Sequence, residues 1–216
     1  MNEEQKLRLN LLEACGYNID TAQKCLDFVL NDNEVNKQKP DYIMADGVYL
    51  IDTTGNAVRY NGRNIVKSIE YIGIIQGNRS LAIALHDVDE KGVTLTSEES
   101  NKDYSCYVHN YMDAVQDWSG QQNTKHLKTV ELNPTIQLEE GEYIPTLAEL
   151  YLICLNCKAI NEAMRLVRGQ ELRGWYWSST EHSATYSWGL DFNYGYANYY
   201  AKEAHTGRIR PIKKFL

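Results

Sequence analysis

The spacing of apolar residues divides the chain into a helical N-terminal segment and a larger domain. Residues 4–31 carry apolar side chains at helical spacing in two short groups, and Asp20 is placed to cap the second group. Residues 31–40 are mostly polar and have the composition of a linker. We therefore expect a helical pair with its linker over residues 1–39 and a main domain over residues 40–216.

Short runs typical of β-strands replace the helical spacing after the linker. Residues 47–51, 69–75 and 80–85 are rich in aliphatic side chains and are separated by Gly, Asn and Asp turns. This pattern predicts the start of an antiparallel sheet.

Helical periodicity returns over residues 104–118 and 146–168. Thr146 precedes Glu149 by three positions, which is the spacing of an N-terminal capping box. We expect one helix over each of these two stretches.

The last part of the chain returns to strands. Trp188, Leu190 and Phe192 alternate with Gly, Asp and Asn, and residues 208–212 form a final strand-like run. The order of strands, helices and strands predicts an α+β fold and not an alternating α/β fold.

Composition narrows the function classes. With 216 residues, of which 43% are hydrophobic and 24% charged, the chain can bury a core. A formal charge of −7 disfavours binding to nucleic acid or to an anionic membrane surface. The N-terminus has no apolar stretch long enough for a signal peptide or a membrane span, so we expect cytoplasmic synthesis without export or membrane insertion. Five irregularly spaced cysteines argue against a disulfide framework.

One segment is unusually rich in aromatic residues. Ten aromatic side chains fall within the twenty-six positions 175–200, interspersed with serine and asparagine. Tyrosine offers a large contact area with only two torsions to freeze, and serine and asparagine add adaptable hydrogen bonding. The segment therefore indicates a recognition surface.

Several short sequence motifs, taken in order, resemble those of a family of bacterial and phage C-type-lectin-like domains. The family includes the major paralogous domain proteins of gut Bacteroidetes and the variable proteins of diversity-generating retroelements. The match covers residues 42–216 and is strongest after residue 144. The match rests on the sequence motifs at residues 144–150, 160–161, 176–181, 188, 192–195 and 208–212.

The resemblance implies a twisted antiparallel sheet with two helices, and a display function. In the retroelement-diversified relatives, the segment between the Trp-Ser-Ser motif (residues 177–179 here) and the Arg-Pro motif (residues 210–211 here) presents variable side chains that contact a ligand. The positions of this sequence that match the display segment are Tyr186, Asn193, Tyr194, Tyr196, Asn198, Tyr199 and Tyr200.

The aromatic rings divide between core and surface. We expect Trp177, Trp188 and Phe192 to pack in the core. Residues 193–200 lack a consistent apolar face of period two, which favours exposure and ligand contact. A hairpin stabilised by cross-strand tyrosine pairs is the alternative.

Other chemistry-bearing residues give weaker signals. Cys154 and Cys157 lie in an apolar helical run without a second ligand pair, so we expect structural thiols in mid-helix and not a zinc or redox site. Residues 87–90 are acidic but lack calcium-site spacing, which indicates an acidic turn. The five histidines form no catalytic or metal motif. Formylglycine-generating enzymes share the fold that the resemblance implies, but their chemistry needs cysteines in the C-terminal part of the domain, and none occurs after Cys157. We expect no cofactor and no metal.

These observations favour a nonenzymatic recognition protein that contacts a macromolecular ligand, protein or glycan. A phage or prophage receptor-binding protein, or a retroelement-diversified variable protein, fits best. Residues 1–31 would serve attachment or homo-oligomerisation. Two alternatives remain open: a structural oligomerisation module, and an enzyme whose cleft gathers Glu181, Asp191 and Arg210.

Overall fold

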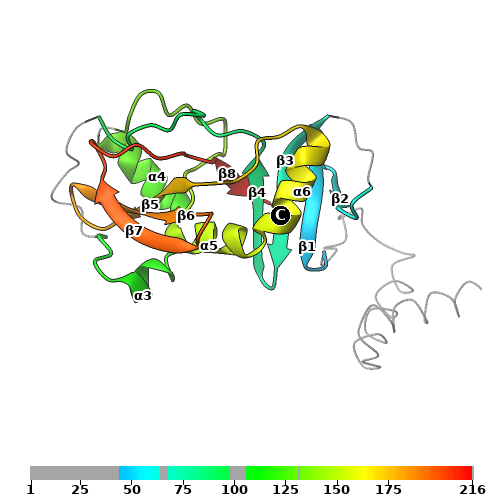
Figure 1. The fold of residues 1–216 in the computed structure, drawn as a ribbon, viewed down its shortest axis with the longest axis horizontal. Coiled ribbons are helices and arrows are strands. Elements are labelled where there is room, and N and C mark those ends of the chain that lie inside the picture. Colours follow the sequence, from blue (N-terminus) through cyan, green and yellow to red (C-terminus); the bar gives the residue numbers. More distant parts are fainter. Residues whose placement is uncertain (1–43, 64–67, 98–105, 131, 216) are drawn as a thin grey trace, which may run out of the picture. The chain divides into compact units, whose positions relative to one another are not determined.

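Two antiparallel sheets and a few helices make up the part of the chain that the computed structural model describes, residues 44–63, 68–97, 106–130 and 132–215 (Figure 1). The mixed α+β class predicted from the sequence is confirmed. The helices expected within residues 1–39 lie outside the described residues.

The larger sheet contains the predicted N-terminal strands. Its order is β2-β1-β3-β4-β8, and all neighbours are antiparallel. The strands run over β1 Gly47–Asp52, β2 Ala57–Arg59, β3 Ile69–Gln76, β4 Arg79–Ala84 and β8 Ile212–Lys214. The strands predicted at residues 47–51, 69–75 and 80–85 are therefore confirmed, and the end of the chain joins the same sheet.

The aromatic segment forms a second, three-stranded sheet. It has the order β5-β6-β7, with β5 at Trp175–Glu181, β6 at Tyr186–Asp191 and β7 at Tyr196–Ala201. In Figure 1 its strands run crosswise to those of the larger sheet.

The predicted helix over residues 146–168 is two helices. Thr146 caps α5 (Leu147–Leu155) with the expected capping box, because its side chain accepts from the Glu149 N–H and the Glu149 carboxylate accepts from the Thr146 N–H. α6 (Cys157–Val167) starts two residues after α5 ends. Asn156 stands between them in a non-helical conformation, and its side-chain amide donates to the Leu152 carbonyl, which draws it back onto the last turn of α5.

The prediction of a helix over residues 104–118 is mostly wrong in its described part. Only α3 (Tyr111–Ala114) is helical there, and the longer helix α4 (Gly120–Thr129) follows it. The sequence of α4 is polar except for Leu127, so no apolar periodicity announces the helix. Buried Thr124 fixes α4 instead, because its hydroxyl accepts from the Ile144 N–H at 2.9 Å.

The strand predicted at residues 208–212 is also only partly correct. Arg208 forms an isolated parallel bridge to Tyr176, and the regular strand β8 begins only at Ile212. Pro211 has no N–H to donate to a ladder, which is consistent with the late start. The segment nevertheless covers the outer edge of β5, because Arg208 exchanges backbone hydrogen bonds with Trp175 and Trp177.

The main core lies between the larger sheet, helices α5 and α6, and one face of the smaller sheet. α6 packs against β1 and β3, and α5 packs against β5 and β6. Trp177, Trp188 and Phe192 are buried as predicted. Trp188 and Phe192 belong to the main core, whereas Trp177 anchors a separate cluster with Leu127 of α4.

None of the helices in the described ranges is long and apolar enough to cross a bilayer.

Candidate ligand-binding surface

The β6–β7 hairpin presents most of the residues of the predicted display segment. Its loop is held by an Asx turn in which the Asp191 side chain accepts from the Asn193 N–H at 2.8 Å. Asn193 in turn accepts from the Gly174 N–H, and Gly195 supplies the left-handed conformation with φ of 64°. Tyr194, at the tip of this fixed loop, is 83% exposed. The loop is thus a rigid support for an exposed ring.

β7 is a free edge strand. No strand within the described residues pairs with its outer side, whereas the opposite edge of the sheet is covered by the segment around Arg208. The Lys202 N–H donates to Thr185, and ladder bonds alternate along an antiparallel pair, so the N–H groups of Ala197 and Tyr199 point outward. The Tyr199 N–H is accepted by the Asn198 side chain at 2.9 Å.

One face of the hairpin is organised around Tyr199. Its ring stacks on His182 with centroids 3.9 Å apart and meets the edges of Tyr186 and Trp188. Tyr186 and Tyr199 remain 41% and 40% exposed. Burial lowers the pKa of His182, with the nearby His109 as a second cause, so the ring that supports Tyr199 is neutral over most of the physiological range.

The other face is organised around Tyr200. This ring stacks on His205 with centroids 4.3 Å apart and meets the edge of Trp175 at 4.9 Å. Gly189, opposite Asn198 on β6, leaves room for the Trp175 indole, since a Cβ there would lie 2.4 Å from the Trp175 ring. Tyr196, on the same face by alternation, is 60% exposed.

The seven predicted residues therefore do not form one flat patch. Tyr186 and Tyr199 lie on one face of the sheet, and Asn193 and Tyr194 form the loop. The remaining three lie on the opposite face: Tyr196, Asn198 and Tyr200. The segment is a cross-strand paired hairpin, and it also exposes tyrosine rings at its tip and edge. A partner that touches rings of both faces must approach along the edge of β7.

The structure adds two rings that the sequence did not point to. Tyr111 of α3 is 44% exposed, and its ring lies 6.3 Å from Trp188. Its hydroxyl lies 2.9 Å from that of Tyr151 on α5. Contacts thus run from Tyr151 through Tyr111 and Trp188 to Tyr199. No local pattern could have found this, because residues 111 and 151 meet only through the tertiary fold.

A buried ion pair holds the base of the hairpin. The Lys202 ammonium, just after β7, lies 2.6 Å from a carboxylate oxygen of Glu181, the last residue of β5. Both side chains are almost completely buried. The His126 ring lies 3.4 Å from the other carboxylate oxygen, and burial lowers its pKa. The pair links the first and third strands of the sheet across β6.

Asp87 belongs to a second buried cluster of polar side chains. The Asp87 carboxylate accepts from the Arg210 guanidinium at 2.7 Å, from Gln170 and from the Tyr176 hydroxyl. The Asp89 carboxylate, by contrast, accepts from the nearby Lys91 N–H at 2.7 Å. The acidic turn expected at residues 87–90 is therefore wrong for Asp87, whose side chain joins the sheets from inside.

The three residues that the enzymatic alternative would gather in a cleft instead make separate contacts. Glu181 pairs with Lys202, Arg210 pairs with Asp87, and Asp191 fixes the hairpin loop. In the described residues, a pocket of about 400 Å³ lies elsewhere, between β4, β8 and α4.

The two cysteines of the Cys-x-x-Cys word lie on either side of the break at Asn156 and not in mid-helix. Cys154 belongs to α5, and Cys157 begins α6. Both are free, and burial raises their pKa values, to about 11 for Cys157. A thiol with a raised pKa is a poor nucleophile, so this environment favours a structural role.

Comparison with known proteins gives no relative: no family model, no curated protein and no solved structure matches the chain.

Proposed function

We propose that this protein is a nonenzymatic recognition protein that binds a macromolecular ligand, protein or glycan, through the exposed tyrosines of the β6–β7 hairpin. The observation that carries the proposal is the contrast within one hairpin. Trp188 and Phe192 are buried, while Tyr194 and Tyr196 are 83% and 60% exposed. Tyr194 lies on a loop fixed by side-chain hydrogen bonds, and Tyr196 begins β7. Tyrosine side chains on a fixed backbone lose little conformational entropy on binding, because each has only two torsions to freeze.

The support beneath the tyrosines also favours recognition. A stacked His182, a neighbouring Trp188 and a buried Glu181–Lys202 pair hold the hairpin from within. Rigid elements hold binding groups more accurately than loops that are free to rearrange. This is the arrangement expected of a scaffold that presents side chains to a partner.

The proposal includes a C-type-lectin-like fold and a phage or prophage origin. Its support is the ordered set of sequence motifs between residues 144 and 212, together with a mixed fold of antiparallel sheets and helices that is compatible with such a domain. A receptor-binding protein of a phage particle or a retroelement-diversified variable protein would use the hairpin in this way. A host-encoded intracellular binder is the nearest competitor.

The test is a binding screen with a matched pair of variants. The full chain is immobilised and exposed to a glycan array and to a displayed library of short peptides. We expect ligands that bind the wild type and the Leu166→Ala control, whose substitution lies on an exposed position of α6. The double variant Tyr194→Ala/Tyr196→Ala should lose them. Ligands that bind all three proteins equally would contradict the proposal.

The free edge of β7 favours a second candidate, a homo-oligomerisation module. Unprotected edge strands pair readily with another chain, and β7 carries no charged residue or proline. Sedimentation equilibrium of the full chain distinguishes the two functions. A dimer lost on substitution of Tyr196 and Tyr199 would favour oligomerisation, and a monomer that binds ligand would favour recognition.

A further inference from the structure

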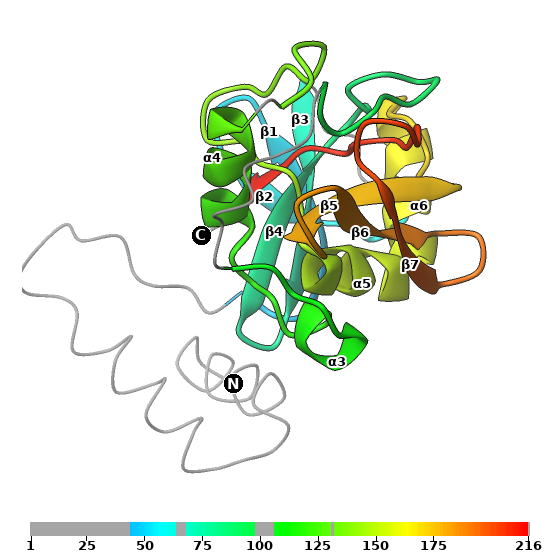
Figure 2. The same ribbon diagram turned by 90° about the vertical axis from the view of Figure 1, so that its left-hand side faces the viewer.

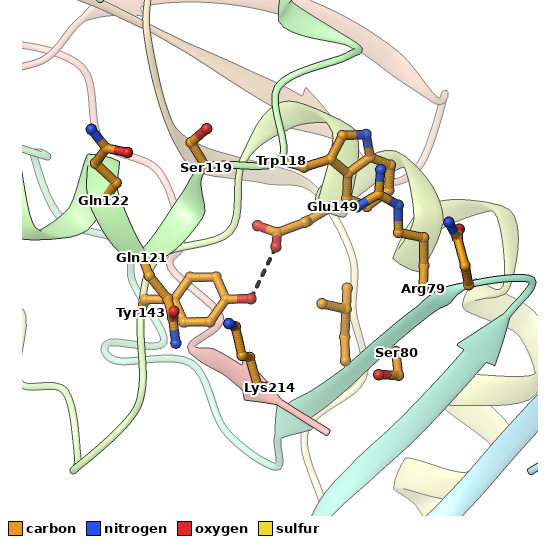
Figure 3. Close-up of a pocket in the computed structure, with 11 residues that line it drawn as sticks. Arg79, Ser80, Trp118, Ser119, Gln121, Gln122, Tyr143, Glu149 and Lys214 are labelled. Atoms are coloured by element: carbon orange, nitrogen blue, oxygen red, sulfur yellow. Dashed lines mark hydrogen bonds between the residues drawn. The ribbon is translucent and has the colours of Figure 1, made fainter. Parts of the chain in front are cut away.

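A polar pocket of about 400 Å³ lies on the larger sheet, between β4, β8 and the beginning of α4 (Figure 3). Its walls include Arg79, Trp118, Tyr143, Glu149 and Lys214. None of the residues of β5, β6 or β7 lines it. Its volume falls within the range of pockets that hold small molecules, which are roughly 300–1,000 Å³.

Arg79 is oriented in this pocket without an anionic partner. Its guanidinium carbon lies 3.9 Å from the centre of the Trp118 ring, in a cation–π contact that holds the group over the indole. Within the described residues, that guanidinium has no hydrogen bond or ion pair. A flat guanidinium held on an indole keeps its N–H donors available, and their fork matches the two oxygens of a carboxylate or a phosphate.

Lys214 adds a second cation from the neighbouring strand. It lines the pocket from β8, and in the part of the chain that the structure describes its ammonium makes no ion pair. Lys213, one position earlier, points to the opposite face of the sheet, where its ammonium lies 3.7 Å from the centre of the Tyr71 ring. Adjacent lysines thus serve different faces, and only Lys214 faces the pocket.

Among the described residues that line the pocket, Glu149 is the one carboxylate, and it does not neutralise these cations. One oxygen of Glu149 accepts from the Tyr143 hydroxyl at 2.9 Å and the other accepts from the Thr146 N–H at 2.8 Å. No ion pair joins it to Arg79 or Lys214 among the described residues. Burial raises the pKa of Glu149 to about 7, so the group is partly protonated at neutral pH. The pocket therefore retains a net positive character.

We infer that this pocket binds the oxyanion group of a small molecule, a carboxylate, sulfate or phosphate. Arg79 supplies the bidentate contact, Lys214 supplies a point charge, and Gln121 and Gln122 at the rim of the pocket offer amide donors. Because the pocket exceeds the size of a single oxyanion, the rest of the molecule lies towards the rim. The inference goes beyond the proposed recognition function and shares no residue with the tyrosine surface.

The experiment is a titration of the full chain with sodium sulfate, followed by heteronuclear NMR at the side-chain N–H groups of Arg79 and Trp118. Sodium chloride at equal ionic strength controls for screening. We expect a saturable shift with a dissociation constant on the order of millimolar. Arg79→Gln and Lys214→Gln should each weaken binding by about tenfold, since each removes a charge-assisted contact.

Two further variants give the design its controls. Lys213→Gln makes the same change of charge on the same strand but on the other face, so it should leave the dissociation constant unchanged. Glu149→Gln removes the neighbouring negative charge and should tighten binding. A linear shift equal to that in chloride, or an equal loss in Lys213→Gln and Lys214→Gln, would overturn the inference. If Arg79→Gln fails to fold, the comparison of the two lysine variants decides alone.

Discussion

At the scale of single residues, buried charged side chains hold the strands of the small sheet in place. Glu181 and Lys202 are both withdrawn from water and pair with each other, with Ser183 and His126 as further neighbours. Removing one member of such a pair leaves the other buried and uncompensated, while removing both exchanges the pair for apolar contact. The pairing of these two side chains therefore decides whether the hairpin keeps its position.

Lys202→Met should destabilise the protein by roughly 3–5 kcal/mol, because it removes the cation that lies 2.6 Å from the buried Glu181 carboxylate. The double variant Glu181→Leu/Lys202→Met should recover much of this loss. Urea unfolding followed by circular dichroism measures both free energies. A double variant that is less stable than the single one would contradict the interpretation of the pair.

Residue roles could be predicted from the sequence where burial follows from the residue type alone. Trp177, Trp188 and Phe192 lie inside as expected, because large apolar rings at alternating positions belong to a core. The role of Asp87 could not be predicted, because its partner Arg210 is 123 positions away. Tyr111 joins the surface rings for the same kind of reason, through a contact that only the fold creates.

At the scale of elements, β7 pairs with β6 on its inner side, and no strand of the described residues pairs with its outer side (Figure 2). The register places the Asn198 N–H towards β6 and the Ala197 N–H towards the open edge. Proline is tolerated on the outer side of an edge strand but not where its missing N–H breaks the ladder. Neighbouring positions should therefore respond very differently to the same substitution.

Ala197→Pro should change the free energy of unfolding by less than about 1 kcal/mol, while Asn198→Pro should cost about 3 kcal/mol or more. Thermal melts and urea unfolding of the two variants provide the measurement. Equal destabilisation by both would show that the register or the free edge of β7 is wrong.

The elements that the sequence predicted are those with local signals. The aliphatic runs at β1, β3 and β4 and the capping box at Thr146 are local, and all are present. α4 has almost no apolar residue and could not be found by periodicity. The break at Asn156 depends on hydrogen bonds that this side chain makes to Leu152 and to Gln76 of the larger sheet.

At the scale of the whole molecule, the buried titratable groups make the stability of the protein depend on pH. Burial raises the pKa of Glu149 from its ordinary value of 4.5 to about 7. Between these two values the native state binds more protons than the unfolded state, so the contribution of Glu149 to stability is lost as pH rises through this window. Burial lowers the pKa values of His126, His182 and His205, and their contribution is lost as pH falls below about 6.5.

Glu149→Gln isolates the first of these opposing contributions. Glutamine keeps the capping hydrogen bond and can donate to the Tyr143 hydroxyl, but it carries no charge. The variant should gain up to roughly 3 kcal/mol relative to the wild type as pH rises from about 4.5 to above 7. Urea unfolding at a series of pH values measures the difference, and a difference that does not change with pH would contradict the raised pKa.

The most direct measurement for the molecule as a whole joins affinity and stability in one pair of variants. For a ligand selected on the full chain, Tyr194→Ala/Tyr196→Ala should weaken binding at least tenfold, about 1.4 kcal/mol, while the free energy of unfolding changes by less than about 1 kcal/mol. Leu166→Ala should change neither quantity by as much. An unchanged affinity in the tyrosine variant, or a loss of binding that follows from unfolding, would contradict a recognition surface at the β6–β7 hairpin.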